Sequence, residues 1–303
     1  MTEVALRLFS PDDLAALTPA VEIARQAGEF RASSDPEGTF FLRSFEVFDH
    51  PVELAVAPDG TVVGFISPEF KVVAVRPDQR RQGIGRRLVE AGIELERARA
   101  RPNLILGVLP DDAAGQAFLR AVGLSFHSTL WDLALPPDAA VAEPTWPGGI
   151  EARSFDRDRD AQPFVALFNA AFASHPTPMH MDESMADRPP DPAFEDADVV
   201  VAVDRASGEL IGFCATSPER EEGVLGPHAE VSTVGVRPDR QGQGLGRQLL
   251  RWGVQRLRMI GVTDVTLSVN GHNEHALALY ESEGFVRVST RERWARPVTG
   301  SGA

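Results

Sequence analysis

The sequence predicts two tandem α/β domains, each built on a mixed central sheet flanked by helices. Three observations support this prediction: a length of 303 residues, an internal repeat, and an alternation of short apolar strands with amphipathic helices. The length is about twice the commonest domain size, and each half could bury roughly two-thirds of its unfolded surface. The chain is therefore long enough for two independent hydrophobic cores.

The repeat is clearest around two glycine-rich segments. Residues 72–92 read VVAVRPDQRRQGIGRRLVEAG and residues 233–253 read TVGVRPDRQGQGLGRQLLRWG, with 11 of 21 positions identical at an offset of 161. Upstream, TVVGFIS at 61–67 parallels ELIGFCA at 209–215 at an offset of 148. The second copy therefore carries an insertion of thirteen residues, SPEREEGVLGPHA at 217–229. Two copies indicate a duplication rather than a solenoid, which needs more and shorter repeats.

The domain extents follow from the repeat and from one segment of distinct composition. LPPDAAVAEPTWPGG at 135–149 is rich in proline, alanine and glycine, which is typical of a linker. We therefore expect an N-terminal domain over residues 1–135, a linker over 136–149 and a C-terminal domain over 150–303.

The second copy shows the order of the elements most clearly. VVVAV at 199–203 and LIGFCAT at 210–216 predict a hairpin around the turn DRASG. EVSTVGV at 230–236 predicts a further strand, which Pro238 ends because proline lacks the N–H that a strand ladder requires.

Two helices and one more strand are predicted in the rest of the second copy. A helix is expected over 247–261, since Leu250, Val254 and Leu257 fall on one face. VTLSV at 265–269 predicts a strand, and EHALALYESEG at 274–284 predicts a short helix. Gly284 is suited to end that helix in the left-handed conformation.

Composition excludes several classes of function. Hydrophobic residues make up 43% and charged residues 24% of the chain, as in ordinary soluble enzymes, and the formal net charge is −14. This acidity argues against sequence-independent binding of nucleic acid or anionic membranes, and it weakly favours cationic ligands such as amines. No apolar run reaches a membrane span, and the N-terminus does not read as a signal peptide. We expect a cytoplasmic protein.

The segment that carries chemistry lies between a strand and a helix in each copy. In the second copy it reads Gln241-Gly242-Gln243-Gly244-Leu245-Gly246-Arg247. Glycines let backbone N–H groups converge on one point, and the helix N-terminus adds partial positive charge, so the loop can hold a phosphate without a side-chain cation. The segment has neither the Rossmann spacing nor the Lys-Ser/Thr of a Walker loop.

Two motifs in this order resemble the GCN5-related N-acetyltransferases. Gln241-x-x-Gly244-x-Gly246 is similar to motif A of that family, and so is Arg80-x-x-Gly83-x-Gly85 in the first copy. Asn273-x-x-Ala276-x-x-x-Tyr280, followed by Gly284-Phe285, resembles motif B. The resemblance covers nearly all of the second domain and most of the first. It implies acetyl-CoA as co-substrate and no metal.

The resemblance also implies which residues bind the cofactor. The pyrophosphate is expected on the glycine-rich loop, with pantetheine between strands 230–236 and 265–269, which splay apart in such folds. Asn273 is expected to cap the last helix and to contact pantetheine. The expected residues of the second copy are Val234, Gly235, Val236, Gln241, Gly242, Gln243, Gly244, Leu245, Gly246, Arg247, Asn273 and Ala276. Those of the first copy are Val73, Ala74, Val75, Arg81, Gln82, Gly83, Ile84, Gly85 and Arg86.

Two residues are candidates for catalysis. Tyr280 matches the tyrosine that protonates the departing CoA thiolate in the family, and the alternative is a core aromatic residue. Glu230 is the candidate general base for the amine, directly or through water, because a half-buried carboxylate can have a raised pKa. The alternative for Glu230 is a solvated carboxylate at a strand end.

The first copy departs from the pattern. At the offset of 161, Leu119 replaces Tyr280 and Asp112 replaces Asn273, while Glu69 retains the acid of Glu230. Leucine cannot donate a proton. We therefore expect the first domain to retain at most CoA binding and the second to be the active one.

The sequence thus predicts an acetyl-CoA-dependent N-acetyltransferase that acts on a small-molecule primary amine by direct attack in a ternary complex. The tandem arrangement with a degenerate first half also resembles the mycothiol synthases, which acetylate a cysteinyl pseudodisaccharide. A non-catalytic CoA sensor and an acetyltransferase acting on a protein N-terminus or lysine remain as alternatives. We expect the partner to be a small amine rather than nucleic acid or membrane, and the protein to be a monomer or homodimer.

Other conspicuous residues have structural explanations. His272 and His275 could suggest a metal pair, but they have no acidic partner in the motif and are expected to be solvated. His175 and His180 lie on a proline-rich loop, where solvent contact is the default expectation. Cys214 is expected to be an inert core thiol. Gly92 and Gly253 recur in the two helices and are expected to allow close packing of helix on sheet.

Overall fold

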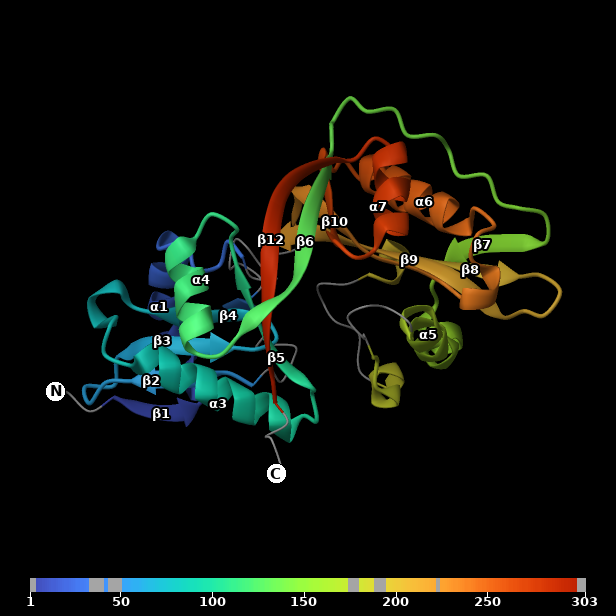
Figure 1. Cartoon of the computed structure of the whole chain (residues 1–303). Helices are drawn as coiled ribbons and strands as arrows, with labels where there is room; N and C mark the ends of the chain where they lie inside the picture. The colour runs from blue at the N-terminus through green and yellow to red at the C-terminus, as the bar shows by residue number, and fades with distance from the viewer. Residues whose placement is uncertain are drawn as a thin grey trace. The chain divides into compact units, whose positions relative to one another are not determined.

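Figure 1 shows the computed structural model of the chain, which describes residues 4–32, 41–42, 51–173, 180–187, 195–221 and 224–298. The chain divides into two compact units: residues 1–130 with 290–303 form unit 1, and residues 131–289 form unit 2. The end of the chain, which the sequence assigned to the second domain, is grouped with unit 1 in this division. Both units combine sheets with helices, which confirms the predicted α/β class.

Unit 1 contains a four-stranded antiparallel sheet of order β1-β2-β3-β4. Its elements are β1 (Ala5–Leu8), α1 (Leu14–Gln26), β2 (Glu53–Val56), β3 (Val62–Ser67), β4 (Val72–Val75), α3 (Ile84–Ala98), β5 (Asn103–Val108), α4 (Ala113–Ala121), the start of β6 (Ser125–Leu135) and most of β12 (Val286–Pro297). Strand β5 pairs instead with β12, antiparallel from Asn103 to Val108. Alternating side chains of β3 feed two cores, with Phe65 packed in the core of α1 and Ile66 in that of α3.

Unit 2 places β11, β10, β9, β8 and β7 side by side in that order, with β6 next to β11. Its elements are the rest of β6, β7 (Ile150–Ser154), α5 (Arg157–Phe172), β8 (Val199–Asp204), β9 (Leu210–Glu221), β10 (Val224–Val236), α6 (Leu245–Met259), β11 (Asp264–Asn270), α7 (Glu274–Ser282) and the start of β12. On β8, Val200 and Ala202 join the core of α6 and α7, whereas Val201 and Val203 join that of α5.

The recurring helix glycines allow helix and sheet to approach closely, as predicted. A Cβ at Gly92 of α3 would lie 2.6 Å from Ile66 Cδ1 of β3. A Cβ at Gly253 of α6 would lie 2.7 Å from Cys214 Sγ of β9. Real Cβ atoms do not approach other atoms this closely, so both helices need glycine at this position to pack on their sheets.

The thirteen-residue insertion of the second copy lengthens a hairpin. The sequence predicts strands that stop at residue 216 and resume at 230, but β9 continues to Glu221 and β10 begins at Val224. The two extensions pair with each other, with Leu225 opposite Arg220. The inserted residues of the second copy therefore form strand rather than an irregular loop over their described part.

The proline-rich segment that was expected to act as a linker lies against α6. Residues 136–149 contain no helix or strand, although all of them are described. Gln255 Nε2 donates to the Val141 carbonyl at 2.8 Å, and Arg258 Nη2 donates to the Ala139 carbonyl at 2.7 Å. Side chains of α6 thus satisfy backbone carbonyls that a segment without secondary structure leaves open.

The same kind of ion pair links the first strand and the first helical turn of each unit. In unit 1, Arg7 of β1 donates through both terminal nitrogens to Asp13, at 2.5 and 2.6 Å. In unit 2, Arg153 of β7 donates in the same way to Asp160 of α5, at 2.5 and 2.9 Å. Bidentate pairs of this kind fix orientation as well as distance. The hydrogen bond from Arg7 lowers the pKa of Asp13 below its ordinary value. Burial opposes ionisation of Asp160, but hydrogen bonds from Arg153 and Arg159 still lower its pKa.

These pairs make stability sensitive to acid. A carboxylate whose pKa is lower in the folded state stabilises the fold above its unfolded pKa, about 4 for aspartate, and loses that contribution as the pH falls further. We expect the free energy of unfolding to decline steadily below about pH 4. Denaturant titrations between neutral pH and about pH 2.5 test this, and the Asp160→Asn variant should show a shallower decline than the wild type. An equally steep decline in the variant would remove Asp160 from the explanation.

A second prediction concerns Gly107 of β5. A Cβ at this position would lie 1.9 Å from the carbonyl oxygen of Ala32 and 2.6 Å from Arg293 Nη1. Because the first obstacle is backbone, relief requires movement of the chain. We expect Gly107→Ala to destabilise the protein by roughly 1–3 kcal/mol or more, measured by denaturant unfolding. Gly148, where a Cβ would meet nothing within 4 Å, supplies the matched control, and an equal loss in Gly148→Ala would contradict the steric argument.

Candidate active site

The candidate site of unit 2 lies where two parallel strands separate. Strands β10 and β11 are paired from His228–Asp264 to Glu230–Thr266. Beyond this point β10 runs to Val236 along β9, and β11 runs to Asn270. In unit 1 the corresponding strands β4 and β5 belong to different sheets. The strands of unit 2 therefore separate where the family resemblance implies, and the corresponding strands of unit 1 do not belong to one sheet.

The part of β10 that does not pair with β11 is shaped by a bulge and by a glycine. The pairing of β10 with β9 shifts between Val231 and Thr233, and Ser232 Oγ donates to the Ala215 carbonyl at 3.1 Å. Farther along, a Cβ at Gly235 would lie 2.3 Å from the Phe213 ring. The predicted segment Val234–Val236 is thus held by packing, with both valines against the core of α6.

The glycine-rich loop of unit 2 is closed by its first residue. Gln241 Nε2 donates to the carbonyl of Val236, the last residue of β10, at 3.1 Å. Gly242 and Gly244 have φ values of +74° and +79°, and a Cβ on either would meet nothing within 4 Å. Gly244 is the N-cap of α6 and makes no side-chain cap hydrogen bond, so it leaves the first amides of the helix without that partner. This geometry suits an anion.

The loop of unit 1 repeats this backbone with different residues. Arg80 Nε donates to the Val75 carbonyl at 3.1 Å, as Gln241 does in unit 2. Gly83 caps α3 with φ of +81°. Arg81 adopts φ of +65° although it has a side chain, which costs energy outside glycine. We call the backbone of this loop the cradle, because it is expected to hold the phosphates. The same cradle conformation is present in both units, over Arg81–Arg86 and over Gly242–Arg247.

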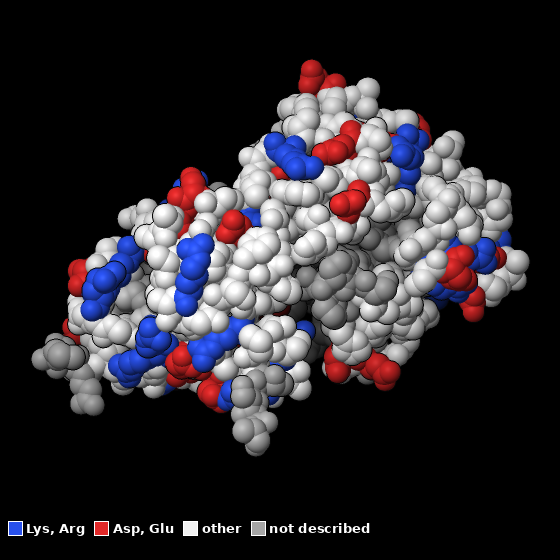
Figure 2. Space-filling view, in the orientation of Figure 1, with Lys and Arg blue, Asp and Glu red and all other residues white. Residues whose placement is uncertain are grey.

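Basic side chains next to the unit 2 loop are paired with acids. Arg240 contacts Asp204, Arg237 contacts Asp239 and Glu209, and Arg247 contacts Glu283. Figure 2 shows basic and acidic side chains interspersed over the face in view. These three arginines are therefore engaged by carboxylates, and the loop itself offers backbone amides and a helix N-terminus, as the sequence predicted.

Gly246 marks where three elements of the site meet. A Cβ at Gly246, in the first turn of α6, would lie 3.8 Å from Val236 Cγ2 of β10 and 3.9 Å from Leu279 Cδ2 of α7. In unit 1, a Cβ at Gly85 would lie 3.7 Å from Val75 Cγ2 and 3.1 Å from the ring of Phe118. The loop helix, the end of the strand and the last helix therefore converge in both units. The other residues expected to contact the cofactor differ in exposure. Leu245, Ile84 and Ala74 are buried, and Val73 is half-buried. Gln243 and Gln82 are exposed.

Tyr280 is next to Leu279 on α7 and packs against the core of unit 2. The helix is set by two predicted features: Asn273 Oδ1 caps it by accepting from the Ala276 amide at 3.1 Å, and Gly284 follows it with φ of +93°. Burial, with a smaller effect of Cys214, raises the pKa of Tyr280 to about 12. Among the described residues, none hydrogen-bonds to the Tyr280 hydroxyl. Tyr280 is thus a protonated phenol at neutral pH with its proton available.

Glu230 lies at the last paired position of β10 and β11. Its neighbours Ala229 and Val231 are buried in the core of α6, so the half-buried Glu230 points to the opposite sheet face, which α5 covers. His228 shares this face, and its Nδ1 lies 3.3 Å from Asp264 Oδ2. His228 is not among the residues predicted from the sequence, although its position two residues before Glu230 on a strand could have indicated it.

In unit 1 the residues equivalent to the catalytic candidates are engaged differently. Leu119 is buried in the core of α3. Glu69 pairs with Arg99 at 3.1 Å. Asp112 caps α4 through its bond to the Gly115 amide at 2.8 Å, so this acid takes over the structural role of Asn273.

The remaining candidates have structural positions. His180, His272 and His275 are exposed, and His175 lies outside the described residues. Cys214 is buried, and burial raises the pKa of its thiol to about 12, which confirms an unreactive core cysteine. In the described ranges, no group of three or more His, Cys, Asp or Glu side chains is arranged to hold a metal. No helix in those ranges is long and apolar enough to cross a bilayer.

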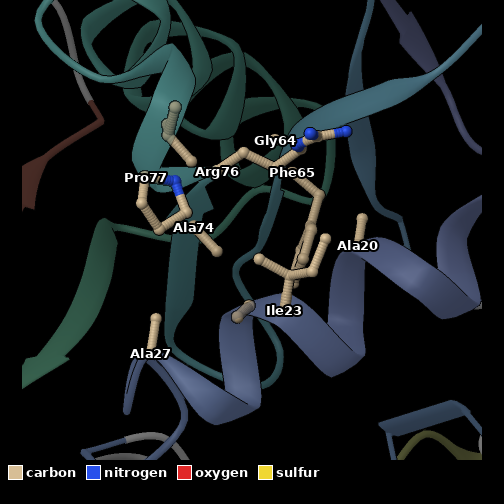
Figure 3. A pocket seen from close by; sticks show the side chains of 10 residues that line it. Ala20, Ile23, Ala27, Gly64, Phe65, Ala74, Arg76 and Pro77 are labelled. Carbon is tan, nitrogen blue, oxygen red and sulfur yellow. The ribbon is translucent and has the colours of Figure 1, made fainter.

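A small pocket in unit 1 lies at the end of β4. Figure 3 shows Ala20 and Ile23 of α1, with Ala27 at its C-cap, facing Ala74 and Pro77 across it. Its volume is about 10 Å³, which is no more than a single water requires. Helix α1 therefore packs against this part of β4.

The family model that matches the chain is that of the Acetyltransferase (GNAT) family, over residues 20–124 and 163–285. Among curated proteins, mycothiol acetyltransferase of Salinispora arenicola is 35% identical over 96% of this chain and 95% of its own length. That of Thermobifida fusca is 32% identical over 91% of this chain and 92% of its own length.

Solved structures show the same fold. A tandem GNAT protein from the clavulanic acid biosynthesis pathway has a TM-score of 0.70 at 21% identity and covers 99% of this chain and 100% of its own. A GCN5-related N-acetyltransferase from Sphaerobacter thermophilus has a TM-score of 0.69 at 22% identity and covers 98% of this chain and 96% of its own.

Proposed function

The chain belongs to the GNAT family of acetyltransferases, and on this premise we propose that unit 2 transfers the acetyl group of acetyl-CoA to the primary amine of a small molecule. The observation that supports this proposal most directly is the convergence at Gly246 of the glycine-rich loop, the C-terminal end of β10 and the helix that bears Tyr280. On this proposal the loop would bind the phosphates, the end of β10 would align the thioester, and Tyr280 would donate the proton.

The residues present suit acetyl-CoA as substrate. The loop from Gln241 to Arg247 offers helix amides and two open, left-handed glycines to the pyrophosphate. Pantetheine would bind between β10 and β11, whose pairing ends at Glu230 and Thr266, and the backbone of Val234–Val236 would align the thioester. Asn273 holds the start of α7 beside this path.

The proposed reaction is direct attack within a ternary complex. The amine nitrogen forms a bond to the thioester carbonyl carbon, and the bond between that carbon and sulfur breaks. Glu230 takes the proton that the amine loses, directly or through water, and Tyr280 gives its phenolic proton to the CoA thiolate. Cys214 is buried with a raised pKa, so it does not serve as the nucleophile of an acyl-enzyme.

We propose the cysteinyl amine of a glucosamine–inositol pseudodisaccharide as the acceptor. Support comes from the mycothiol acetyltransferases, of which two are 32% and 35% identical over more than nine-tenths of this chain. Helix α5 covers the sheet face to which Glu230 points, and it and the inserted hairpin of β9 and β10 would contribute acceptor contacts. The excess of acidic residues suits a protonated amine.

The test is an acceptor panel of the cysteinyl pseudodisaccharide, aminoglycosides and polyamines. Because the first acceptor carries its own thiol, turnover is followed by loss of the thioester absorbance and by mass detection of the acetylated product. We expect kcat/KM to be highest, by at least about tenfold, for the cysteinyl acceptor. Preference for another amine would replace the acceptor, and CoA binding without turnover of any amine would favour a CoA sensor.

Unit 1 is proposed to retain a CoA cradle without transfer. Its loop over Arg81–Arg86 and strand Val73–Val75 keep the backbone of unit 2, but Leu119 has no proton to give and Glu69 is paired with Arg99. Calorimetry of the wild type and of Gly83→Val measures this directly. A stoichiometry that falls from two CoA to one in the variant supports a cradle in unit 1, and one CoA in both proteins excludes it.

A further inference from the structure

A buried carboxylate connects the two helices of the proposed site in unit 2. Glu283 is the C-cap of α7, and its side chain is buried. Arg251 of α6 donates to it from Nε at 2.7 Å and from Nη2 at 3.0 Å. Arg247, in the first turn of α6, contacts the same carboxylate. Figure 1 shows α6 and α7 next to each other in unit 2.

The triad of Glu283, Arg247 and Arg251 is held in one geometry by its charges and hydrogen bonds. Burial opposes ionisation of Glu283, but hydrogen bonds from Arg251 and Arg247 outweigh it and lower the pKa. Charge-assisted hydrogen bonds to a buried carboxylate are strong only when donors and acceptor keep a well-defined geometry. The guanidinium groups also lie at the C-terminal end of α7, where positive charge is favourable. The triad therefore fixes the end of α7 against the helix that begins at the cofactor loop.

Tyr280 is one helical turn before Glu283 on α7. The Glu283 amide donates to the Tyr280 carbonyl at 3.1 Å, and so does the Phe285 amide, also at 3.1 Å. Phe285 is buried, with its ring centroid 6.2 Å from that of Tyr280. A displacement of the Glu283 end of α7 would thus move the phenol as well.

Unit 1, in which Leu119 replaces the tyrosine, also lacks the carboxylate that links the two helices. At the same offset Val122 stands for Glu283 and Glu90 for Arg251, while Arg86 retains the position of Arg247. Arg86 Nη2 donates to the Ala121 carbonyl at 2.8 Å instead. A stable unit can therefore be built on this plan without the triad, so folding alone does not require it.

We propose that Glu283 is a positioning residue for acetyl transfer, which holds Tyr280 at the cofactor loop through Arg247 and Arg251. The inference rests on the proposed function for its kinetic consequence but not for its structural one. It requires that loss of the Glu283 charge displaces the phenol and slows proton donation to the CoA thiolate.

The structural test uses the single tyrosine of the chain. Biosynthetic replacement of tyrosine by meta-fluorotyrosine gives one fluorine NMR signal, which reports the surroundings of Tyr280 without turnover. We expect Glu283→Gln to shift or broaden this signal. Asp160→Asn removes a similarly buried, arginine-paired carboxylate from α5 of the same unit, and it should leave the signal in place. An unchanged signal in Glu283→Gln would overturn the proposal even if the protein proves inactive.

The kinetic test separates positioning from general destabilisation. We expect Glu283→Gln to lower kcat by about 10- to 100-fold, as small misplacements of catalytic groups do, with KM for acetyl-CoA changed by no more than about twofold. In a Tyr280→Phe background the same substitution should lower kcat by less than about twofold, because the group that it positions is gone. Arg251→Gln should reproduce part of the loss if Glu283→Gln folds poorly. Equal losses in both backgrounds, or an equal loss in Asp160→Asn, would overturn the proposal, whereas an inactive wild type would overturn the proposed function instead.

Discussion

Replacing Tyr280 with phenylalanine is expected to lower kcat by about 10²–10⁴ with little change in acetyl-CoA affinity. The substitution removes only the hydroxyl, so the packing of the ring against the core of unit 2 remains. Without the phenolic proton the CoA thiolate must leave unprotonated. This raises the free energy of the transition state but not that of the bound acetyl-CoA. An effect on kcat without an effect on cofactor binding is the signature of such a group.

The measurement must isolate acetyl transfer from product release. Rapid-quench single turnovers report the transfer step, and calorimetry reports acetyl-CoA affinity for both proteins. Unchanged single-turnover rates in Tyr280→Phe would exclude Tyr280 as the proton donor. Phe285→Leu, which alters the neighbouring buried ring, controls for simple loss of aromatic packing and should cost far less in the transfer step.

The pH profile tests the same residue independently. Burial raises the pKa of Tyr280 to about 12, whereas an ordinary tyrosine titrates near pH 10. A donor is lost as the pH rises through its pKa, so the transfer rate should not fall because of tyrosine ionisation below about pH 11. A decline centred near pH 10 in the wild type that is absent from Tyr280→Phe would show that the phenol is solvated rather than buried.

The sequence revealed the features that depend on local or repeated patterns. Asn273 as a helix cap, Gly284 as a left-handed stop and Gly253 as a contact glycine each follow from one residue in a periodic setting, and the structure confirms all three. Strand 199–203 was likewise evident as an apolar run before the turn DRASG, and strand 265–269 from its alternation.

Features set by distant partners were not evident. The inserted residues of the second copy form strands because each extension pairs with the other, as Leu225 does with Arg220. The polar sequence of each alone indicates a loop. Glu283 reads as a surface residue at a helix end until Arg247 and Arg251, more than thirty positions earlier, are seen to bury it. Long-range pairing of this kind has no local signal.

Substitution of Gly244 by valine is expected to abolish CoA binding at unit 2, with a loss of at least about 10² in affinity, because each charge-assisted bond is worth about 1.5–3 kcal/mol. The φ of +79° is unfavourable for a β-branched residue, so the loop must change conformation and its amides must turn away. A Cβ at this site would also project into the open space above the helix N-terminus, where the phosphates are proposed to bind.

Gly261 supplies the matched control at the other end of the same helix. It follows the C-cap Ile260 with φ of +95°, and a Cβ there would also meet nothing within 4 Å. Gly261→Val should therefore cost a similar amount of stability, roughly 1–2 kcal/mol, while CoA affinity and kcat/KM stay close to wild type. Calorimetry and denaturant unfolding of both variants separate backbone strain from loss of the phosphate site. Retained affinity in Gly244→Val would refute the cradle in unit 2, and an equal loss in Gly261→Val would assign the effect to strain in α6 rather than to the anion site.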